Sequence, residues 1–302
     1  RGRRDDHQTH RLLPRLEQSP AARCSGLDTV IRVRHNGRMS ESAISVAELE
    51  EFALELAQLA GSIALANFRR PVDITNKDAA GFDPVTSADH AIEQILRTTI
   101  LERYPDHGIV GEEQGRTESL SPYTWYVDPI DGTRAFMMGS PLWGTLVGLT
   151  VDSVPTFGLM VQPVLEEVFL GTPESSWLIK PDDRRRLAAR SCETLEQAVL
   201  VSTHPDLFAE PAASAFSALA DRCLLNRWGG DCYNYAMLAA GFVDLVVEDQ
   251  LKPFDIVPLI PILQGAGCII TDWSGTAAPG GGQVLAAATA ELHAAALAVL
   301  NN

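Results

Sequence analysis

Several features are scarce or absent in this 302-residue sequence, and each absence argues against a class of protein. No apolar run is long enough to span a bilayer, and there is no P-loop, no strand-linked G-x-G-x-x-G motif and no internal repeat. The five cysteines are an odd number without C-x-x-C pairs or zinc-ligand spacing, which favours free thiols in a reducing compartment. The formal net charge of −15 argues against nucleic acid and anionic membranes as partners. We therefore expect a cytoplasmic globular protein.

The first 38 residues differ from the rest because they are basic. They carry nine arginines against four acidic residues and show no helical periodicity. The segment Met39-Ser40-Glu41-Ser42 looks like a natural start. We predict that residues 1–38 are a disordered extension of upstream or tag-like sequence. An organelle transit peptide is the alternative, since such peptides are also rich in arginine, although they avoid acidic residues.

The remaining chain divides into two halves with different patterns. Residues 39–180 begin with two amphipathic helices and continue with strands of an antiparallel meander. Residues 181–302 alternate strands with helices, which is typical of an α/β layer architecture. The expected helices span 46–63, 88–100, 209–221, 231–240, 255–265 and 290–300. The expected strands after the central motif span 144–151, 156–161, 167–170, 177–179, 198–202, 223–228, 243–248 and 268–271.

The stretch Asp128-Pro129-Ile130-Asp131-Gly132-Thr133 shows the strongest sign of chemistry. Pro129 has no N–H to continue a strand, so we expect the preceding apolar strand to end there, with Asp128 at its mouth. Asp131 follows three residues later, and Gly132 lets the backbone turn with its N–H groups exposed. Two carboxylates beside free amides suit a hard divalent cation and a phosphate. The alternative is an ordinary turn, because Asp-Pro and Asp-Gly are common turn formers.

Three further acidic residues lie where helices or strands are expected to begin or end. Asp89 follows Thr86 with the spacing of a helix capping box, which is its structural alternative. Glu112 follows a short apolar strand, and its alternative is an exposed acidic loop. Asp255 lies at the start of a helix. Carboxylates gathered without basic partners repel one another unless a cation binds, and an all-oxygen set favours Mg²⁺ over Zn²⁺.

Together and in this order, these motifs resemble those of the inositol monophosphatase family of Mg²⁺-dependent phosphatases, over about residues 45 to 300. The matching stretches are Asp83-Pro84-Val85-Thr86-x-x-Asp89, Gly111-Glu112-Glu113, Asp128-Pro129-Ile130-Asp131-Gly132-Thr133, and Asp255 ahead of Gly265-Ala266-Gly267. The resemblance implies the αβαβα sandwich of inositol monophosphatase and fructose bisphosphatase. It also implies a phosphoric monoester hydrolase that acts on a small-molecule phosphate ester by metal-activated water.

The resemblance implies a role for each matching residue. The metal ligands, for about two or three Mg²⁺ ions per site, would be four side chains and one carbonyl: Glu112, Asp128, Asp131, Asp255 and the carbonyl of Ile130. Asp89 and Thr133 would orient and deprotonate the attacking water, and with Glu112 they form the catalytic set. The amides of Gly132 and Thr133 would bind the phosphate.

Within the family, the sequence is similar to the histidinol-phosphate phosphatase subgroup. The shared stretches are Asp131-Gly132-Thr133-Arg134-Ala135-Phe136, Gly139-x-Pro141-x-Trp143-Gly144-Thr145, Trp228-Gly229-Gly230-Asp231-Cys232-Tyr233 and Leu251-Lys252-Pro253-Phe254-Asp255. Asp231 and Glu248 would then contact the cationic amino alcohol, which a neutral polyol would not require. The alternative for Asp231 is the N-cap of the helix that it begins. Phe254 stands where the family usually has Trp.

The predicted reaction is the hydrolysis of L-histidinol phosphate to L-histidinol and phosphate, a step of histidine biosynthesis. The alternatives are an inositol 1-monophosphatase or another sugar or nucleotide 3′-phosphatase of the same family. A third hypothesis is an inactive metal-binding homologue, which is disfavoured because such a protein has no reason to keep costly clustered charges. The sequence leaves open whether the chain is a monomer or a homodimer.

Overall fold

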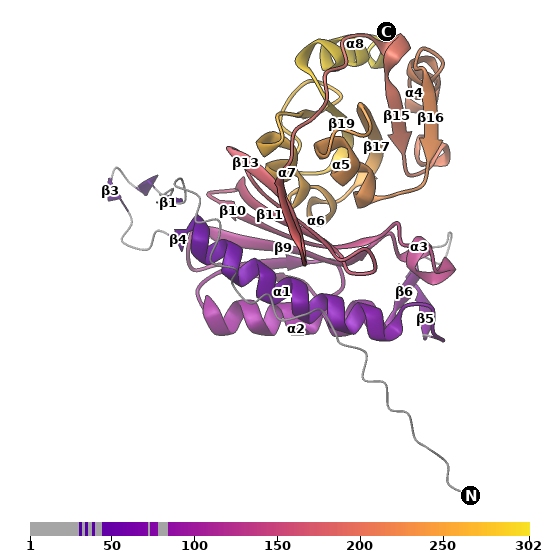
Figure 1. Cartoon of the computed structure of the whole chain (residues 1–302). Coiled ribbons are helices and arrows are strands. Elements are labelled where there is room, and N and C mark those ends of the chain that lie inside the picture. Colours follow the sequence, from indigo (N-terminus) through magenta and orange to yellow (C-terminus); the bar gives the residue numbers. More distant parts are fainter. Residues whose placement is uncertain (1–29, 32–33, 36–37, 40–43, 72, 78–83) are drawn as a thin grey trace, which may run out of the picture.

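The computed structural model describes residues 30–31, 34–35, 38–39, 44–71, 73–77 and 84–302 (Figure 1). Before residue 44 it gives only short strands: β1 (Val30–Ile31), β2 (Arg34–His35) and β3 (Arg38–Met39). Most of the predicted disordered extension, residues 1–38, lies outside the described residues, so its disorder stays a prediction. Among the described helices, none combines the length and the apolar character needed to cross a membrane.

Alternating layers of helix and sheet form the fold, as Figure 1 shows. α1 and α2 cover one face of an eight-stranded sheet, and α5, α6 and α7 lie between this sheet and a five-stranded sheet. α4 and α8 cover the far face of the second sheet. The predicted αβαβα sandwich is confirmed. The helices are α1 (Val46–Asn67), α2 (Ser87–Arg103), α3 (Thr133–Met138), α4 (Ala212–Ala220), α5 (Cys232–Ala239), α6 (Pro253–Ile256), α7 (Leu259–Gly265) and α8 (Ala290–Leu300).

The larger sheet has the strand order β14-β13-β12-β11-β10-β9-β7-β8, and only the β7–β9 pair is parallel. The antiparallel meander from β10 to β13 confirms the predicted hairpins, whereas β14 lies in a charged segment that was not predicted to be a strand. The chain division at residues 180 and 181 stays a prediction, and the sheet itself continues as far as β14. Its strands are β7 (Gly108–Gly111), β8 (Gly115–Thr117), β9 (Tyr123–Asp131), β10 (Gly144–Val151), β11 (Val154–Gln162), β12 (Glu167–Thr172), β13 (Ser175–Lys180) and β14 (Asp183–Arg186).

The smaller sheet has the order β16-β15-β17-β19-β18, with parallel pairing on both sides of β15 and antiparallel pairing on both sides of β19. β19 was not predicted, because its alanines and preceding glycines have low strand propensity. Burial between two neighbouring strands overrides that propensity. The strands are β15 (Val199–Ser202), β16 (Leu225–Trp228), β17 (Leu245–Leu251), β18 (Ile269–Asp272) and β19 (Gly282–Ala287). The short pairs elsewhere are β1 with β4 (Ile44–Ser45), β2 with β3, and β5 (Ile74–Asn76) with β6 (Pro84–Thr86).

Two local expectations are wrong. The single helix expected over 255–265 is two helices, α6 and α7, which meet at Pro258, because proline lacks the N–H that a continuous helix needs. The strand expected to end before Asp128 continues through Pro129. The proline is tolerated because the register of β9 with β10 shifts just after Asp128 pairs with Leu146. Pairing with β7 ends at Val127, so Asp128 lies where β9 has lost one neighbour.

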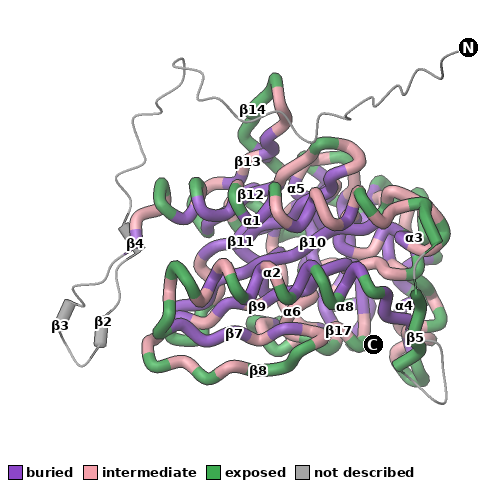
Figure 2. Tube along the Cα trace, turned by 90° about the horizontal axis from the view of Figure 1, so that it is seen from below, coloured by how far each residue is buried: buried purple, intermediate pink, exposed green. Residues whose placement is uncertain are grey.

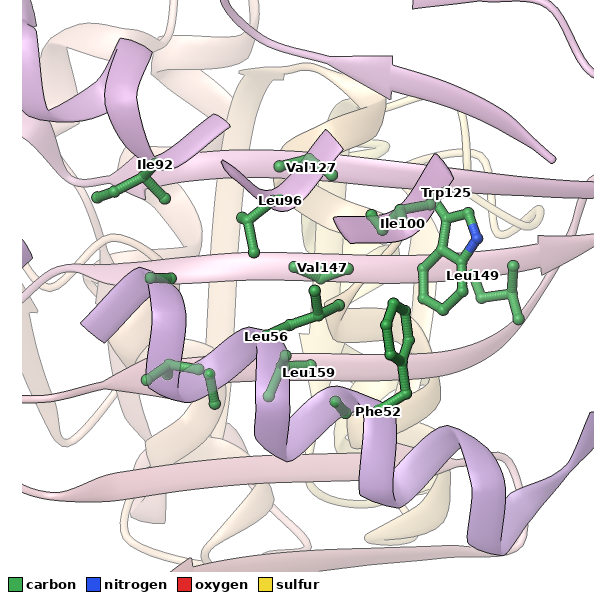
Figure 3. Packing of buried hydrophobic residues seen from close by; sticks show 14 of the residues in the cluster. Phe52, Leu56, Ile92, Leu96, Ile100, Trp125, Val127, Val147, Leu149 and Leu159 are labelled. Atoms are coloured by element: carbon green, nitrogen blue, oxygen red, sulfur yellow. The ribbon is translucent and has the colours of Figure 1, made fainter. Parts of the chain in front are cut away.

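The hydrophobic core between the first two layers places the strand that carries Asp128. Phe52 of α1 packs edge-on against Trp125 of β9, with ring centroids 5.8 Å apart (Figure 3). Leu56 of α1 and Leu96 of α2 are fully buried in the same cluster. In Figure 2 the buried stripes of α1 and α2 alternate with exposed residues, as the amphipathic pattern predicts. This packing fixes the position of β9, and the end of β9 carries Asp128 and Asp131.

Candidate metal and substrate site

Three carboxylates from two parts of the chain meet at the end of β9. Asp128 and Asp131 come from β9 and Asp255 comes from α6, and one oxygen of each lies within 4.8 Å of the others. Asp128 is almost fully buried, and its Oδ1 has no hydrogen-bond partner. A buried carboxylate oxygen without a donor is a costly arrangement, which a bound cation would relieve.

Backbone amides orient the other two members of this cluster. The N–H of Cys232, at the start of α5, donates to Asp131 Oδ1 at 2.8 Å. The N–H of Lys252 donates to Asp255 Oδ2 at 2.7 Å. Both donors belong to the second half of the chain, so the cluster forms only when the two halves pack together. The free carboxylate oxygens remain available to a ligand.

The electrostatics of the cluster favour the binding of a cation. Burial, reinforced by Glu112 and the neighbouring aspartates, holds the pKa of Asp128 well above its usual range. Burial, followed by Asp231 and Asp255, does the same for Asp131. Burial, with a contribution from Glu112, raises the pKa of Asp255 to about 7. Hard oxygen ligands at this spacing fit a divalent cation such as Mg²⁺.

Glu112 lines the same cavity but has a cationic partner of its own. It directly follows β7, and its Oε1 accepts a hydrogen bond from the ammonium of Lys77 at 2.8 Å. Lys77 also reaches Glu113 Oε1 at 2.9 Å. Burial raises the pKa of Glu112, and Lys77 partly offsets that rise. The structure therefore places Glu112 beside the cluster, in an ion pair instead of on an exposed acidic loop.

Asp89 is held by its own helix. Its Oδ2 accepts the N–H of Thr86 at 2.8 Å and the hydroxyl of Thr86 at 2.6 Å, which confirms the capping box. Its Oδ1 is buried and has no partner. Burial raises the pKa of Asp89 to about 6, against the lowering effect of the Thr86 hydrogen bonds. Asp89 thus caps α2 through one carboxylate oxygen and keeps the other, Oδ1, as a buried acceptor without a partner.

No direct hydrogen bond joins Asp89 and Thr133, the two residues to which the resemblance assigns the attacking water. The Thr133 hydroxyl donates to the carbonyl of Ile130 at 3.0 Å, the carbonyl that the resemblance makes a metal ligand. A cation on that carbonyl would compete with the hydroxyl for its lone pairs. Gly132 has a φ of 90°, and an added Cβ would lie 3.0 Å from the carbonyl oxygen of Leu142, so only glycine fits this turn.

Two further acidic residues, Asp231 and Glu248, line the same cavity. Glu248 on β17 is 1% exposed, and its Oε1 accepts the N–H of Thr203 at 2.7 Å and the Thr203 hydroxyl at 3.0 Å. Burial raises the pKa of Glu248 to about 8. Burial also raises the pKa of Asp231 to about 6, and the charge of Arg134 opposes that rise. Asp231 occupies the N-cap position of α5, but its side chain makes no capping hydrogen bond.

A single cavity of about 550 Å³ joins the two groups of acids. Its lining includes the metal-site carboxylates, the turn at Gly132 and Thr133, and the wall formed by Asp231 and Glu248. Asp89 does not line it. The cavity thus offers carboxylates for a bound cation and two further acids that a cationic ligand could pair with. The volume suits a small phosphate ester.

The sequence model of the inositol monophosphatase family matches residues 45–302. The chain belongs to this family. A histidinol-phosphatase of Mycobacterium tuberculosis is 32% identical over 237 residues, which cover 78% of this chain and 91% of that protein. The bifunctional phosphatase IMPL2, chloroplastic, of Arabidopsis thaliana is 42% identical over 241 residues, covering 78% of this chain and 68% of the relative. An inositol monophosphatase structure from Zymomonas mobilis superimposes with a TM-score of 0.76 at 35% identity, covering 86% of this chain and all of that one.

Three residues of the cavity were given no role from sequence. Lys77 is 35 residues from Glu112, and Thr203 is 45 residues from Glu248, so no local motif joins the partners. Arg134 lies in the Gly132-Thr133-Arg134 stretch, and its position in that motif was the only available signal. Long-range pairs of this kind follow from the packing of the two halves.

Proposed function

We propose that this family member is a Mg²⁺-dependent phosphomonoesterase whose substrate is L-histidinol phosphate. The observation that carries the proposal is that Asp231 and Glu248 line the same cavity as the carboxylate cluster. Histidinol phosphate has an ammonium and an imidazole at one end and a phosphate at the other. Buried carboxylates recognise cations by charge-assisted hydrogen bonds, whereas a neutral polyol gains nothing from two buried acids. The histidinol-phosphatases among the relatives support this choice.

The metal would be held by the residues named from the resemblance: Glu112, Asp128, Asp131, Asp255 and the carbonyl of Ile130. The orphaned Oδ1 of Asp128 and the raised pKa values of the cluster support this assignment. Bound Mg²⁺ would supply charge neutralisation for the phosphoryl group and acidify a water. Glu112 would join the ligands by exchanging its Lys77 partner for the metal.

Asp89 and Thr133 would handle the proton of the attacking water. The buried Oδ1 of Asp89 is a free acceptor, and the Thr133 hydroxyl is both a donor and an acceptor. In the loaded enzyme the hydroxyl would turn from the Ile130 carbonyl toward the water, and Asp89 would accept the proton that passes through it. The amides of Gly132 and Thr133 would hold the phosphate oxygens during the transfer.

Hydrolysis of inositol 1-phosphate is the second candidate. It is favoured by the likeness to an inositol monophosphatase structure and by the plant relative, whose name is that of a bifunctional phosphatase. The cavity accommodates both classes of ester by volume. The two candidates differ in whether Asp231 and Glu248 contribute to substrate binding.

The test is phosphate release by the purified protein from L-histidinol phosphate and from inositol 1-phosphate, each with Mg²⁺ and with excess chelator. We expect a clear preference for histidinol phosphate and no release in chelator, because the cluster cannot neutralise the phosphoryl group alone. Release that persists in chelator would overturn the metal mechanism. A preference for the inositol ester would overturn the substrate assignment and leave the phosphatase assignment standing.

A further inference from the structure

A buried ion pair on α2 lies directly behind the turn that carries Glu112 and Glu113. Glu93 is 0% exposed, and its Oε1 accepts a guanidinium N–H of Arg97 at 3.1 Å. The same carboxylate accepts two backbone N–H groups of the turn, from Glu113 at 2.7 Å and from Gln114 at 3.0 Å. One carboxylate therefore holds two consecutive amides of the turn.

Arg97 extends the clamp to the other side of the turn. Its guanidinium donates to the carbonyl of Gly115 at 3.0 Å and to the hydroxyl of Thr117 at 2.8 Å, both on β8. The backbone before the turn is fixed as well, because the N–H of Glu112 donates to the carbonyl of Val127 on β9 at 3.1 Å. The turn is tied to α2, to β8 and to the strand that carries Asp128.

The backbone that leads into the turn lies in close contact with the Glu93 carboxylate. A Cβ added at Gly111, the last residue of β7, would lie 2.1 Å from Glu93 Oε1. The backbone at the start of the turn thus rests on the carboxylate itself. A glutamine in place of Glu93 would present one acceptor oxygen and one NH₂ group, and the NH₂ group would face a backbone N–H. The turn would have to move to avoid two opposed donors.

We propose that Glu93, together with Arg97, is a positioning residue that holds the turn so that Glu112 faces the cation site. This inference rests on the proposed role of Glu112 as a metal ligand. Neither Glu93 nor Arg97 lines the cavity. Their effect on the metal passes through the backbone amides of the turn, as the partners of metal ligands do elsewhere.

The test compares Glu93→Gln with a matched control, Asp244→Asn. Asp244 is also fully buried, and it also accepts one arginine, Arg190 at 2.7 Å, and one backbone N–H, that of Val199 at 2.8 Å. It does not line the cavity. Both variants should lower the melting temperature of the metal-free protein. Only Glu93→Gln should raise the Mg²⁺ concentration needed for half-maximal thermal stabilisation, by roughly tenfold or more.

Arg97→Lys is the second variant, in case Glu93→Gln does not fold. Lysine keeps the charge beside Glu93 but cannot reach Gly115 and Thr117 together, so a smaller shift in the same direction is expected. Equal Mg²⁺ midpoints in wild type and in the folded variants would overturn the positioning role, as would an equal shift in Asp244→Asn. A wild-type protein that gains no stability from Mg²⁺ would instead overturn the proposed metal site, and the inference with it.

Discussion

Two groups of buried or partly buried acids line the cavity, the metal cluster (Asp128, Asp131 and Asp255) and the pair Asp231 and Glu248. In the metal cluster, Asp128 Oδ1 has no donor, and Asp131 and Asp255 each accept one backbone amide. In the pair, a single oxygen, Glu248 Oε1, accepts both the N–H and the hydroxyl of Thr203. Burial raises the pKa of the acids in both groups. The metal cluster and Glu248 therefore differ in how many donors the protein supplies to each acid.

This difference indicates what each group is for. Three acids that together accept only two backbone amides, with Asp128 Oδ1 left without a donor, form an incomplete set, and a hard cation would complete it. Glu248 is oriented in advance by its hydrogen bonds, and a cationic ligand that pairs with it would favour its ionised form. The metal cluster should therefore govern whether the reaction occurs, and Asp231 and Glu248 should govern which ester reacts.

The largest expected effect comes from Asp128→Asn in the metal cluster. Losing several kcal/mol of charge stabilisation in the transition state should lower turnover by about 10³-fold. The metal-free variant should be at least as stable as wild type, because a buried charge with an unpartnered oxygen is removed. Turnover with Mg²⁺ and chemical unfolding without it are the measurements. Wild-type turnover in the variant would contradict the cluster's role, and a large loss of stability would contradict its description as incomplete.

A somewhat smaller effect is expected at the water-activating pair. Thr133→Ala and Asp89→Asn should each lower kcat by about 10²-fold or more, with little change in KM, because general base catalysis acts on the chemical step. The double variant should lose little beyond either single one, since the two groups act as a unit. Steady-state kinetics on all three variants decide this. An effect confined to KM, or full additivity, would show that the two residues act separately.

The smallest expected effect is on stability as a function of pH. Acids whose folded pKa is raised stabilise the fold when protonated, and that contribution is lost as pH rises through the folded pKa. Asp255, with a pKa of about 7, and Asp89, with a pKa of about 6, place the loss between their ordinary pKa of about 3.8 and about pH 7.

The metal-free melting temperature should therefore fall across that window, and Mg²⁺ should restore more stability at pH 8 than at pH 5, because it binds the ionised form. Thermal unfolding at several pH values, with chelator and with saturating Mg²⁺, measures both. A metal-free melting temperature that rises with pH, or a Mg²⁺ effect independent of pH, would count against the account.

Much of the fold could be predicted because local patterns and packing agree. The apolar stripe that includes Phe52 and Leu56 predicted α1, and the spacing of Thr86 and Asp89 predicted the start of α2. The course of β9 was mispredicted because a register shift, which depends on β10, accommodates Pro129. β19 was missed because its alanines have low strand propensity and are buried only when β19 pairs with β17 and β18 in the folded sheet.

In the candidate site, too, local features could be predicted from the sequence and long-range contacts could not. The acids near the central stretch are visible in the sequence because their strand ends and turns are local features. The ion pair between Lys77 and Glu112 and the hydrogen bonds from Thr203 to Glu248 are not visible, because they join segments that only the fold brings together. The hydrogen bond from the Thr133 hydroxyl to the Ile130 carbonyl could not be predicted either, since it depends on the conformation of the turn.

The most direct test of the central claim compares wild type with Glu248→Gln by kcat/KM for L-histidinol phosphate and for inositol 1-phosphate. Charge-assisted hydrogen bonds contribute roughly 1.5–3 kcal/mol, so the substitution should lower kcat/KM for histidinol phosphate by about 10- to 100-fold. The kcat/KM for the inositol ester should change much less, because that ester offers no cation to Glu248. A wild-type preference for histidinol phosphate that shrinks in the variant is the predicted result. A wild-type preference for the inositol ester, or an equal loss for both esters, would contradict the account.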